Sequence, residues 1–240
     1  MSSYILKIQL LSDTTFGRGD GVAGLVDQEV EHDRYGFPYL RGRTLKGLLS
    51  EECDNLVEVI QNDSHREYWQ KISNLLFGQP GSTLDNQGIL HVGDACLAND
   101  LRNAIALQLD SESEKKRKNP KYKPKLATTD ILESLTSIRR QTAINPETGS
   151  STKRSLRSGR VILRNLPFES KLLFTRELSI NSVEDNDILT LLTIGVLALR
   201  RIGSGRNRGR GHVKCNFWNI DLTKEITQDE SLIKRFEREI

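Results

Sequence analysis

The sequence predicts an α+β protein built around a ferredoxin-like βαββαβ core. Three observations predict this class: segments with the two-residue alternation of β-strands, segments with the 3.6-residue period of amphipathic helices, and the order in which the two kinds follow each other. Once the long polar insertions are removed, that order reduces to the split βαβ plan. We expect one domain over residues 1–240, with insertions at about 12–38 and 110–159.

The N-terminal part of the chain predicts a strand, a long loop and two helices. Tyr4–Leu11 alternates as a central strand does. Residues 12–38 contain five glycines and no helical period, which predicts an extended loop of the length that usually carries function. Thr44–Gln61 presents one apolar face and forms a helix. A second helix, Tyr68–Phe77, is closed by Gly78 in a left-handed cap.

The middle of the chain is more polar. Residues 79–87 are rich in turn-forming residues and predict a connector, after which Gly88–Leu97 predicts a strand. Asn99–Leu109 favours a short helix, and Ser111–Pro124 predicts a charged, mobile loop. Thr128–Gln141 mixes helical and loop signals.

The C-terminal part predicts a polar hairpin and the second half of the core. Thr142–Ser158 is a polar turn region around a hairpin-like tip. Two strands, Arg160–Asn165 and Lys171–Ile180, flank Pro167. The last helix spans Asp187–Arg201, and Val213–Leu222 is the closing strand. The acidic tail that follows either packs on the core or contacts a neighbour.

Charge is segregated along a chain whose formal net charge is only +3. Lys115–Lys125 holds seven basic residues and no acid, and Arg200–Lys214 holds six basic residues and no acid. Such segregation indicates a basic binding face. For Lys115–Lys125 alone, a solvated loop is an equally good explanation.

The cysteines and the hydropathy of the sequence indicate the cellular compartment of the protein. Cys53, Cys96 and Cys215 are far apart and odd in number, which is typical of a reducing cytoplasm rather than a disulfide framework or a zinc site. The N-terminus lacks a signal-peptide pattern, and the longest apolar run, Ile188–Leu199, is too short to span a bilayer. We therefore expect a cytoplasmic protein with no membrane partner.

The strongest local signal is the stretch from Ile202 to His212, which has four glycines, three arginines and no acid. Glycine lets the backbone approach a ligand closely, and the arginine fork matches phosphate geometry. A tight turn between a helix and a strand would need far fewer residues than this loop contains. The loop therefore predicts contact with a polyanion, and RNA is the first candidate.

A second glycine-containing segment, Tyr39–Gly47, opens the first helix and places Lys46 in its first turn. Helix N-termini bind phosphate through free N–H groups. The spacing does not match a Walker A motif, which argues against ATP hydrolysis. Ordinary capping by Arg43 or Thr44 is an equal alternative.

The early loop carries several acids beside these basic elements. A carboxylate there could hold Mg²⁺ with several waters, or align a ribose 2′-hydroxyl for attack on the neighbouring phosphate. Solubility explains most of these charges equally well, and one histidine is weak support for a general base. The residues are Asp20, Asp27, Glu29, Glu31, His32 and Asp33.

Basic residues flank the predicted hairpin of Thr142–Ser158, with only Glu147 opposing them. A hairpin of this kind lies along a nucleic-acid backbone or wedges between bases. A disordered surface loop has equal weight. The flanking residues are Arg139, Arg140, Lys153, Arg154 and Arg157.

Four segments together resemble the RAMP superfamily (repeat-associated mysterious proteins), most closely the backbone subunits of type III CRISPR effector complexes. They are Gly17–Asp33, Gly36–Gly47, Leu76–Gly78 with Gly88–Asp94, and Gly203–Gly211. The Leu-Lys-Gly segment that follows Pro38 is the most specific part. Arg139–Ala143 is similar to the family segment that starts the thumb, with Arg139 in place of an acid.

The resemblance implies an RNA-recognition core with an inserted thumb hairpin, stacked with other subunits on a CRISPR guide RNA. It implies that Asp27, after Val26, is the catalytic residue and the ligand of Mg²⁺ or another divalent cation, whereas Asp33 is structural. Gln28 and Glu29 stand where the family usually has Ser-Pro. The expected RNA-binding residues are Arg41, Arg43, Lys46, Arg139, Arg140, Gly203, Gly205, Arg206, Arg208, Gly209 and Arg210.

The function that the resemblance implies is RNA-guided cleavage of complementary target RNA, in antiviral defence, by a metal-dependent endoribonuclease active in the assembled complex. Two alternatives stay open. The chain is a non-catalytic RNA-binding scaffold of the same complex, or it is a metal-independent guide-processing endoribonuclease that uses His32 or Tyr35. Substitution of Asp27 distinguishes the scaffold from the nuclease, because only the nuclease would lose cleavage. Chelation of the metal distinguishes the processing enzyme, because its cleavage would survive EDTA.

Overall fold

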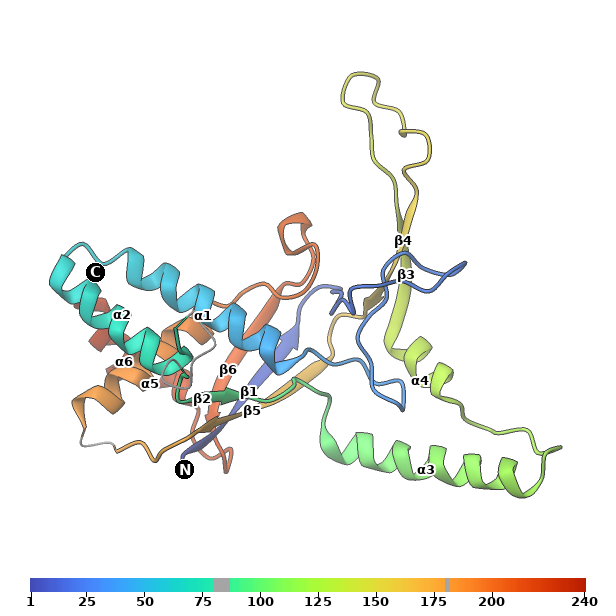
Figure 1. Cartoon of the computed structure of the whole chain (residues 1–240), viewed down its shortest axis with the longest axis horizontal. Helices are drawn as coiled ribbons and strands as arrows, with labels where there is room; N and C mark the ends of the chain where they lie inside the picture. Colours follow the sequence, from blue (N-terminus) through green and yellow to red (C-terminus); the bar gives the residue numbers. More distant parts are fainter. Residues whose placement is uncertain (80–86, 180–181) are drawn as a thin grey trace.

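The computed structural model describes residues 1–79, 87–179 and 182–240. It is a mixed α/β structure with a four-stranded and a two-stranded antiparallel sheet (Figure 1). The predicted connector at residues 79–87 lies almost wholly outside the described residues. No helix in the described part of the chain is both long enough and apolar enough to cross a membrane.

The main sheet has the order β2-β5-β1-β6, and every neighbouring pair is antiparallel. The strands are β1 (Ser3–Leu10), β2 (Leu90–Val92), β5 (Pro167–Phe174) and β6 (Val213–Asn219). Buried residues alternate with more exposed ones along β1, β5 and β6. One face of the sheet therefore supplies the core, as the sequence periodicity predicted.

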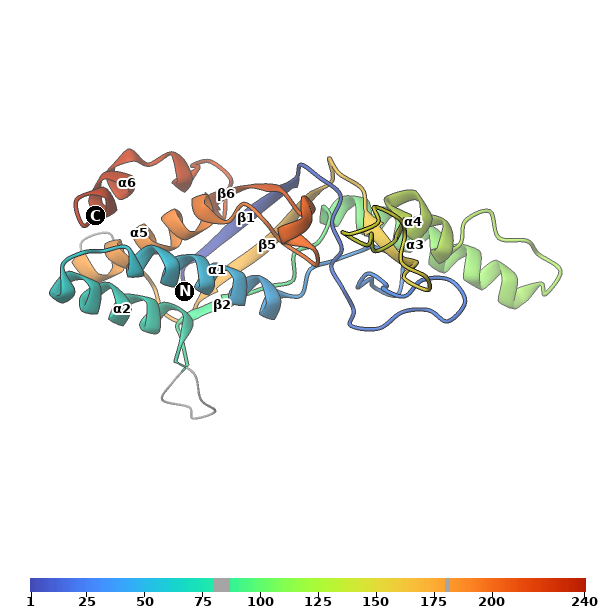
Figure 2. The ribbon, with the colours of Figure 1, turned by 90° about the horizontal axis from the view of Figure 1, so that it is seen from above.

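Four helices pack beside this sheet: α1 (Gly42–Glu58), α2 (Asp63–Phe77), α5 (Val183–Ala198) and α6 (Glu230–Glu237) (Figure 2). Their apolar faces and the inner face of the sheet form one continuous buried cluster. Gly78 closes α2 at a φ of 92° and donates its N–H to Asn74. The four helices and the sheet thus form one packed body at one end of the molecule.

The acidic tail packs on the core, one of the two options that the sequence left open. Asp229 caps α6 by accepting a hydrogen bond from the Ser231 N–H, and Phe236 packs edge-on against Trp69 at 5.1 Å. Arg235 of α6 pairs with the fully buried Asp187 of α5 at 2.9 Å. Asp187 therefore anchors the tail to α5, which begins at Val183, four residues before the predicted start of this helix.

The two-stranded sheet is a hairpin that projects from the body (Figure 1). Its strands are β3 (Thr136–Gln141) and β4 (Arg157–Ile162). This confirms the predicted hairpin around Thr142–Ser158. The predicted strand Arg160–Asn165 lies three residues earlier in the structure, because β4 pairs with β3 over Arg157–Ile162.

Two further strand predictions were wrong in extent. Pro167 opens β5 instead of separating two strands, which is possible because its ring sits at the first position of the strand. The predicted strand Lys171–Ile180 accordingly begins earlier and ends at Phe174. The predicted strand Gly88–Leu97 is regular only over Leu90–Val92, and its later residues form isolated bridges.

Between β2 and β3 the chain forms an arm of two helices, α3 (Asn99–Lys118) and α4 (Thr128–Leu135). The predicted short helix Asn99–Leu109 continues to Lys118 and has 20 residues. The loop predicted at Ser111–Pro124 was therefore wrong up to Lys118. Ion pairs Glu112–Lys115 and Glu114–Lys118, together with four basic residues in the last turn, stabilise this polar part without an apolar period.

Candidate nucleic-acid interface

The loop Gly203–Gly211, between α5 and β6, is fastened to the segment that follows β1. Ser204 N–H donates to the Thr15 carbonyl at 2.8 Å, and the Thr14 hydroxyl donates to the Ile202 carbonyl at 3.0 Å. Gly211 has a φ of 71°, and a Cβ there would lie 1.9 Å from the Ile202 oxygen. Glycine is thus required at this close approach. The result is a loop standing beside the hairpin (Figure 1).

The three arginines of this loop differ in their surroundings. Arg206 makes two hydrogen bonds, of 2.9 and 3.0 Å, to the carboxylate of Glu51 on α1. Arg208 and Arg210 form no ion pair with any described residue, and both line hollows in the surface. These two guanidinium groups are therefore available to an anion.

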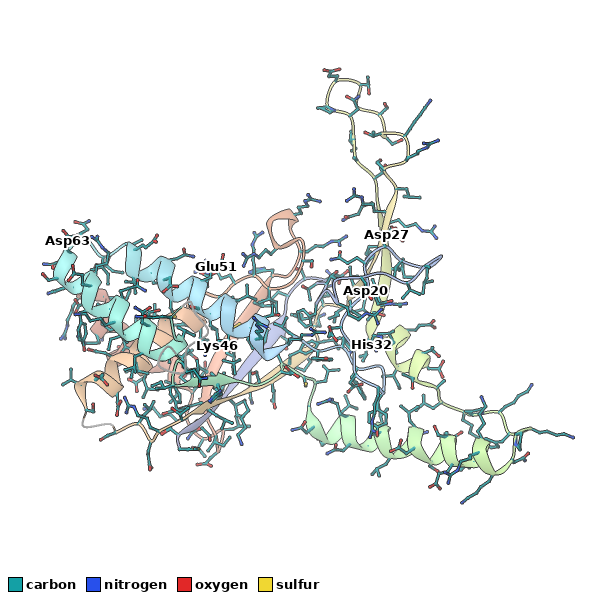
Figure 3. All side chains as sticks on the ribbon, viewed as in Figure 1. Asp20, Asp27, His32, Lys46, Glu51 and Asp63 are labelled. Carbon is teal, nitrogen blue, oxygen red and sulfur yellow. The ribbon has the colours of Figure 1, made fainter. Side chains whose placement is uncertain are left out.

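Asp27 lies at the base of the hairpin (Figure 3). Its Oδ2 accepts hydrogen bonds from the Ser158 backbone N–H at 2.6 Å and from the Ser158 hydroxyl at 3.2 Å. These two bonds, the backbone one first, hold the pKa of the Asp27 carboxyl below its ordinary range. The carboxylate is exposed and stays ionised at neutral pH.

A buried ion pair next to Asp27 fixes the early loop to the hairpin. Glu29 and Arg160 are 2% and 6% exposed, and the Arg160 Nε donates to Glu29 Oε1 at 2.8 Å. Arg160 also donates its backbone N–H to the Gln28 carbonyl at 2.9 Å. The two residues that follow Asp27 are therefore both fixed to Arg160 of the hairpin, and they hold Asp27 in place. Glu29, which follows Gln28 in the sequence, has a structural task.

A cavity of about 400 Å³ brings together the three sequence regions that were singled out. The early loop contributes two carboxylates, and the hairpin and the loop Gly203–Gly211 contribute four guanidinium groups. Cations outnumber anions, so the cavity suits a phosphate more than a free metal ion. Its charged side chains are Asp20, Asp27, Arg139, Arg157, Arg208 and Arg210.

This cavity belongs to a row of four hollows, in which each hollow shares lining residues with the next one. A hollow of about 270 Å³ at the start of α1 shares Ser204 and Arg206 with one of about 380 Å³. The latter shares Arg208 and Arg210 with the Asp27 cavity. Arg210, with Arg139, then continues into a hollow of about 670 Å³. Together they form one concave path, which we call the arginine path.

The predicted residues at the start of α1 have distinct positions. Arg41 lines the first hollow and pairs with Glu31 at 2.7 Å, and Arg43 is exposed. Lys46 lies instead against β2, where its Nζ donates to the Leu90 carbonyl at 2.9 Å, and burial lowers its pKa. Arg41 is thus on the arginine path, whereas the Lys46 ammonium is engaged elsewhere.

On the hairpin, Arg139 lines two of the hollows and donates to Asp13 at 2.9 Å. Arg140 is exposed on the same strand. The sequence reasoning missed Asp13 and Ser158 as parts of the site. Asp13 follows the first strand without any local motif, and the link from Ser158 to Asp27 spans 131 residues.

Asp33 organises the turn that follows the early loop. Its Oδ1 accepts the backbone N–H groups of Tyr35 at 2.9 Å and Phe37 at 3.0 Å, and Arg102 donates to its Oδ2 at 2.9 Å. The His32 ring makes one hydrogen bond among the described residues, in which its Nδ1 donates to the Asp33 carbonyl at 3.1 Å. Neither side chain lines the arginine path.

The described residues contain no group of three or more histidine, cysteine or acidic side chains suited to hold a metal ion. Of the two carboxylates in the cavity, only Asp27 has an oxygen without a hydrogen bond, because Ser158 uses only its Oδ2 and Arg18 binds both oxygens of Asp20. Mg²⁺ takes one or two carboxylates and completes its shell with water and phosphate oxygens. Asp27 therefore fits a divalent ion shared with a bound phosphate.

Comparison with known proteins gives a family and a fold. Residues 7–214 match the family model of the RAMP superfamily. The CRISPR system Cmr endoribonuclease Cmr4 of Pyrococcus furiosus is 35% identical over 97 residues, which are 40% of this chain and 30% of that protein. The matched segment thus spans less than a third of this curated relative.

Two solved structures share the fold. A chain of the type III-B Cmr-beta complex bound to cognate target RNA matches with a TM-score of 0.58 and 14% identity, over 90% of this chain and 97% of its own length. A chain of the apo state of Cmr-beta matches with a TM-score of 0.58 and 15% identity, over 92% and 98% respectively.

Proposed function

This chain belongs to the RAMP superfamily, and we propose that it is a backbone subunit of a type III CRISPR effector complex that binds guide RNA and cleaves complementary target RNA. One observation carries the proposal. An ionised, exposed carboxylate, Asp27, lies in a cavity with four arginines, on the arginine path. The names of the similar proteins, an endoribonuclease and a complex bound to target RNA, support the same assignment.

We further propose that the core is ferredoxin-like and that the chain is one domain. The order β2-β5-β1-β6, with antiparallel neighbours and with helices between β1 and β2 and between β5 and β6, supports this assignment. The early loop and the segment that contains the arm and the hairpin are then insertions. Both insertions contribute to the Asp27 cavity, together with Arg208 and Arg210 from the loop that joins α5 to β6.

The arginine path supplies the contacts for the RNA backbone. Its guanidinium groups match phosphate oxygens in pairs, and contacts of this kind position RNA without reading its sequence. Arg208 and Arg210 have no carboxylate partner among the described residues and bind phosphate directly. The other three arginines must each exchange a carboxylate partner for a phosphate; they are Arg41, Arg139 and Arg206. Base pairing to the guide then supplies the specificity.

The proposed reaction is a transfer within the target strand. The 2′-oxygen of one ribose attacks the adjacent phosphorus, the bond from phosphorus to the 5′-oxygen breaks, and the proton lost by the 2′-hydroxyl is balanced by one gained at the leaving oxygen. The products are a 2′,3′-cyclic phosphate and a 5′-hydroxyl. Arginines of the cavity stabilise the negative charge that grows on the phosphate.

Asp27 serves this reaction as a fixed negative charge. Because its pKa is held low, it is a weak proton acceptor and a good ligand for a cation. A divalent ion held by Asp27 and the scissile phosphate would supply further charge stabilisation. The two hydrogen bonds from Ser158 hold the carboxylate by Oδ2 and leave Oδ1 without a hydrogen bond.

The test uses the assembled complex and a guide-complementary RNA. Asp27→Ala should abolish cleavage and leave RNA binding unchanged, and EDTA should abolish cleavage by the wild type. Cleavage that persists with Asp27→Ala would make the chain a scaffold with the nuclease elsewhere. Cleavage of guide precursor that survives EDTA would favour the processing alternative.

A further inference from the structure

The far end of the arm carries the densest positive charge of the chain, and the proposed function does not use it. We call residues 115–125, the end of α3 and the segment that follows it, the basic tip. It holds seven lysines and arginines and no acid. Helix α3 has 20 residues and therefore extends about 30 Å. Figures 1 and 2 both show it at the opposite end of the molecule from α6.

The basic tip has a defined shape, because a single buried carboxylate closes it. Glu112 is 4% exposed and accepts hydrogen bonds from the Lys115 ammonium at 2.9 Å, the Tyr122 hydroxyl at 2.9 Å and the Lys125 backbone N–H at 2.8 Å. The chain therefore reverses direction around Glu112. A segment that served only solubility would have no need of this anchor.

The carboxylate of Glu112 is already occupied by these three hydrogen bonds, so it does not neutralise the outward positive charges of the basic tip. Lys116, Arg117, Lys121 and Lys123 are exposed and form no ion pair within the described residues. The helix dipole favours cations in the last turn of α3, but Lys121 and Lys123 lie beyond the helix. Dipole compensation thus explains only part of the cluster.

The composition of the basic tip favours a nucleic-acid partner over a protein partner. Protein interfaces have an apolar centre and are depleted in lysine. The basic tip offers only Tyr122 and two prolines, and Tyr122 is half-buried against Glu112. Lysines at close spacing, without apolar anchors, suit a run of phosphates that is bound by charge.

We propose that the basic tip is a second RNA-binding surface, which holds the phosphate backbone of target RNA beyond the arginine path. This inference rests on the proposed function for the identity of the RNA. It requires neither Asp27 nor cleavage, because binding by charge is independent of the reaction. The role of the basic tip is to increase affinity and association rate without reading sequence.

The experiment measures target RNA binding by the assembled complex, with a fourfold variant of the basic tip: Lys116→Gln, Arg117→Gln, Lys121→Gln and Lys123→Gln. Lys115 and Lys125 are kept because they contact Glu112. The probe is a labelled RNA complementary to the guide, with and without unpaired extensions. A charge-matched control changes four basic residues at the other end of the molecule: Lys71→Gln, Lys224→Gln, Lys234→Gln and Arg238→Gln.

The fourfold variant should bind the extended RNA on the order of tenfold more weakly near 50 mM salt, with a salt slope reduced by about 0.7 for each lost single-strand contact. The charge-matched control should bind as the wild type does. A variant with arginine in place of the three lysines should keep full affinity, because charge rather than shape is required.

Two results would overturn the inference: unchanged affinity and salt slope with both RNAs, or a fourfold variant that no longer assembles with the other subunits, which would make the basic tip a protein contact. Cleavage at saturating RNA separates this inference from the proposed function. If the wild type does not cleave but the fourfold variant still loses affinity, the RNA-binding surface stands and the nuclease assignment falls.

Discussion

The carboxylate of Asp27 accepts a hydrogen bond of 2.6 Å from the backbone nitrogen of Ser158, which lies 131 residues later in the chain. In return, the Asp27 N–H donates to the Ser158 carbonyl at 2.8 Å. The early loop and the base of the hairpin are therefore joined by reciprocal hydrogen bonds between these two residues. The position of the Asp27 carboxylate depends on the position of the hairpin base.

A first prediction follows from the proposed RNA binding, for which Glu51 would compete with phosphate for Arg206. Glu51 holds Arg206 with two hydrogen bonds in an exposed position. Glu51→Gln releases this guanidinium, so the Kd for RNA should fall by up to about fivefold, the range expected for an exposed ion pair. Filter binding at low salt measures it. Glu58→Gln on the same helix removes the same charge and should have a smaller effect; equal effects would exclude competition.

The loop Gly203–Gly211 tests the requirement for glycine. Gly209 and Gly211 both have positive φ, but only Gly211 would bring a Cβ against the backbone, at 1.9 Å from the Ile202 oxygen. Gly209→Ala should cost about 1 kcal/mol of stability, as expected for a left-handed residue alone. Gly211→Ala should lower the melting temperature more and weaken RNA binding. Equal losses for the two variants would mean that the close approach does not matter.

The buried pair of Glu29 and Arg160 should dominate the stability of the site. Glu29→Ala leaves the guanidinium of Arg160 buried without its partner, so the free energy of unfolding should fall by about 3–5 kcal/mol. The matched control is Glu169→Ala, which breaks a half-exposed pair with Lys7 at 3.9 Å and should cost less than about 1 kcal/mol. Urea unfolding compares them. A Glu29→Ala variant as stable as the control would contradict this account.

The basic tip should lose its shape in acid. Hydrogen bonds from Lys115, the Lys125 backbone and Tyr122 lower the pKa of Glu112 from its ordinary 4.5 to about 2. Because the folded pKa lies below the unfolded one, this stabilisation is full above pH 4.5 and is lost as the pH falls through about 2. Hydrogen exchange of residues 119–125 measures it.

The control for that experiment lies two residues further along α3. Glu114→Gln removes an exposed carboxylate that is 3.8 Å from Lys118 and should leave exchange at the basic tip unchanged. Glu112→Gln should give fast exchange already at neutral pH. Protection that does not change between pH 6 and 2, after correction for intrinsic rates, would show that Glu112 does not hold the basic tip.

Local periodicity was enough to predict most of the core. The apolar face of Leu45 and Leu49 indicated α1, and both residues are fully buried. It did not predict the second half of α3, because that part is stabilised by charge pairs and carries no apolar period. The helix α6 had a readable signal, with a cap at Asp229 and Leu232 and Phe236 four residues apart, but the acidic composition of the tail obscured it.

The parts of the site could be predicted, but their arrangement could not. The sequence motifs indicated the early loop, the hairpin flanks and the loop Gly203–Gly211 as separate binding elements. That all three line one cavity follows from long-range contacts, such as those of Glu29 with Arg160 and of Thr14 with Ile202. Such contacts leave no periodic trace in a single sequence. Arg157 was noticed only as a flank, although it lines the cavity with Asp27.

The most direct test of the central claim is the cleavage rate of complementary RNA by a complex in which every copy carries Asp27→Asn. Asparagine keeps an oxygen for the hydrogen bonds of Ser158, removes the negative charge and replaces the second oxygen with an NH2 group. Cleavage should fall by at least about a hundredfold, while RNA affinity and assembly stay as in the wild type. Asp20→Asn, in the same cavity, should change the rate far less. Cleavage by Asp27→Asn within a few-fold of the wild type would contradict the assignment of this carboxylate.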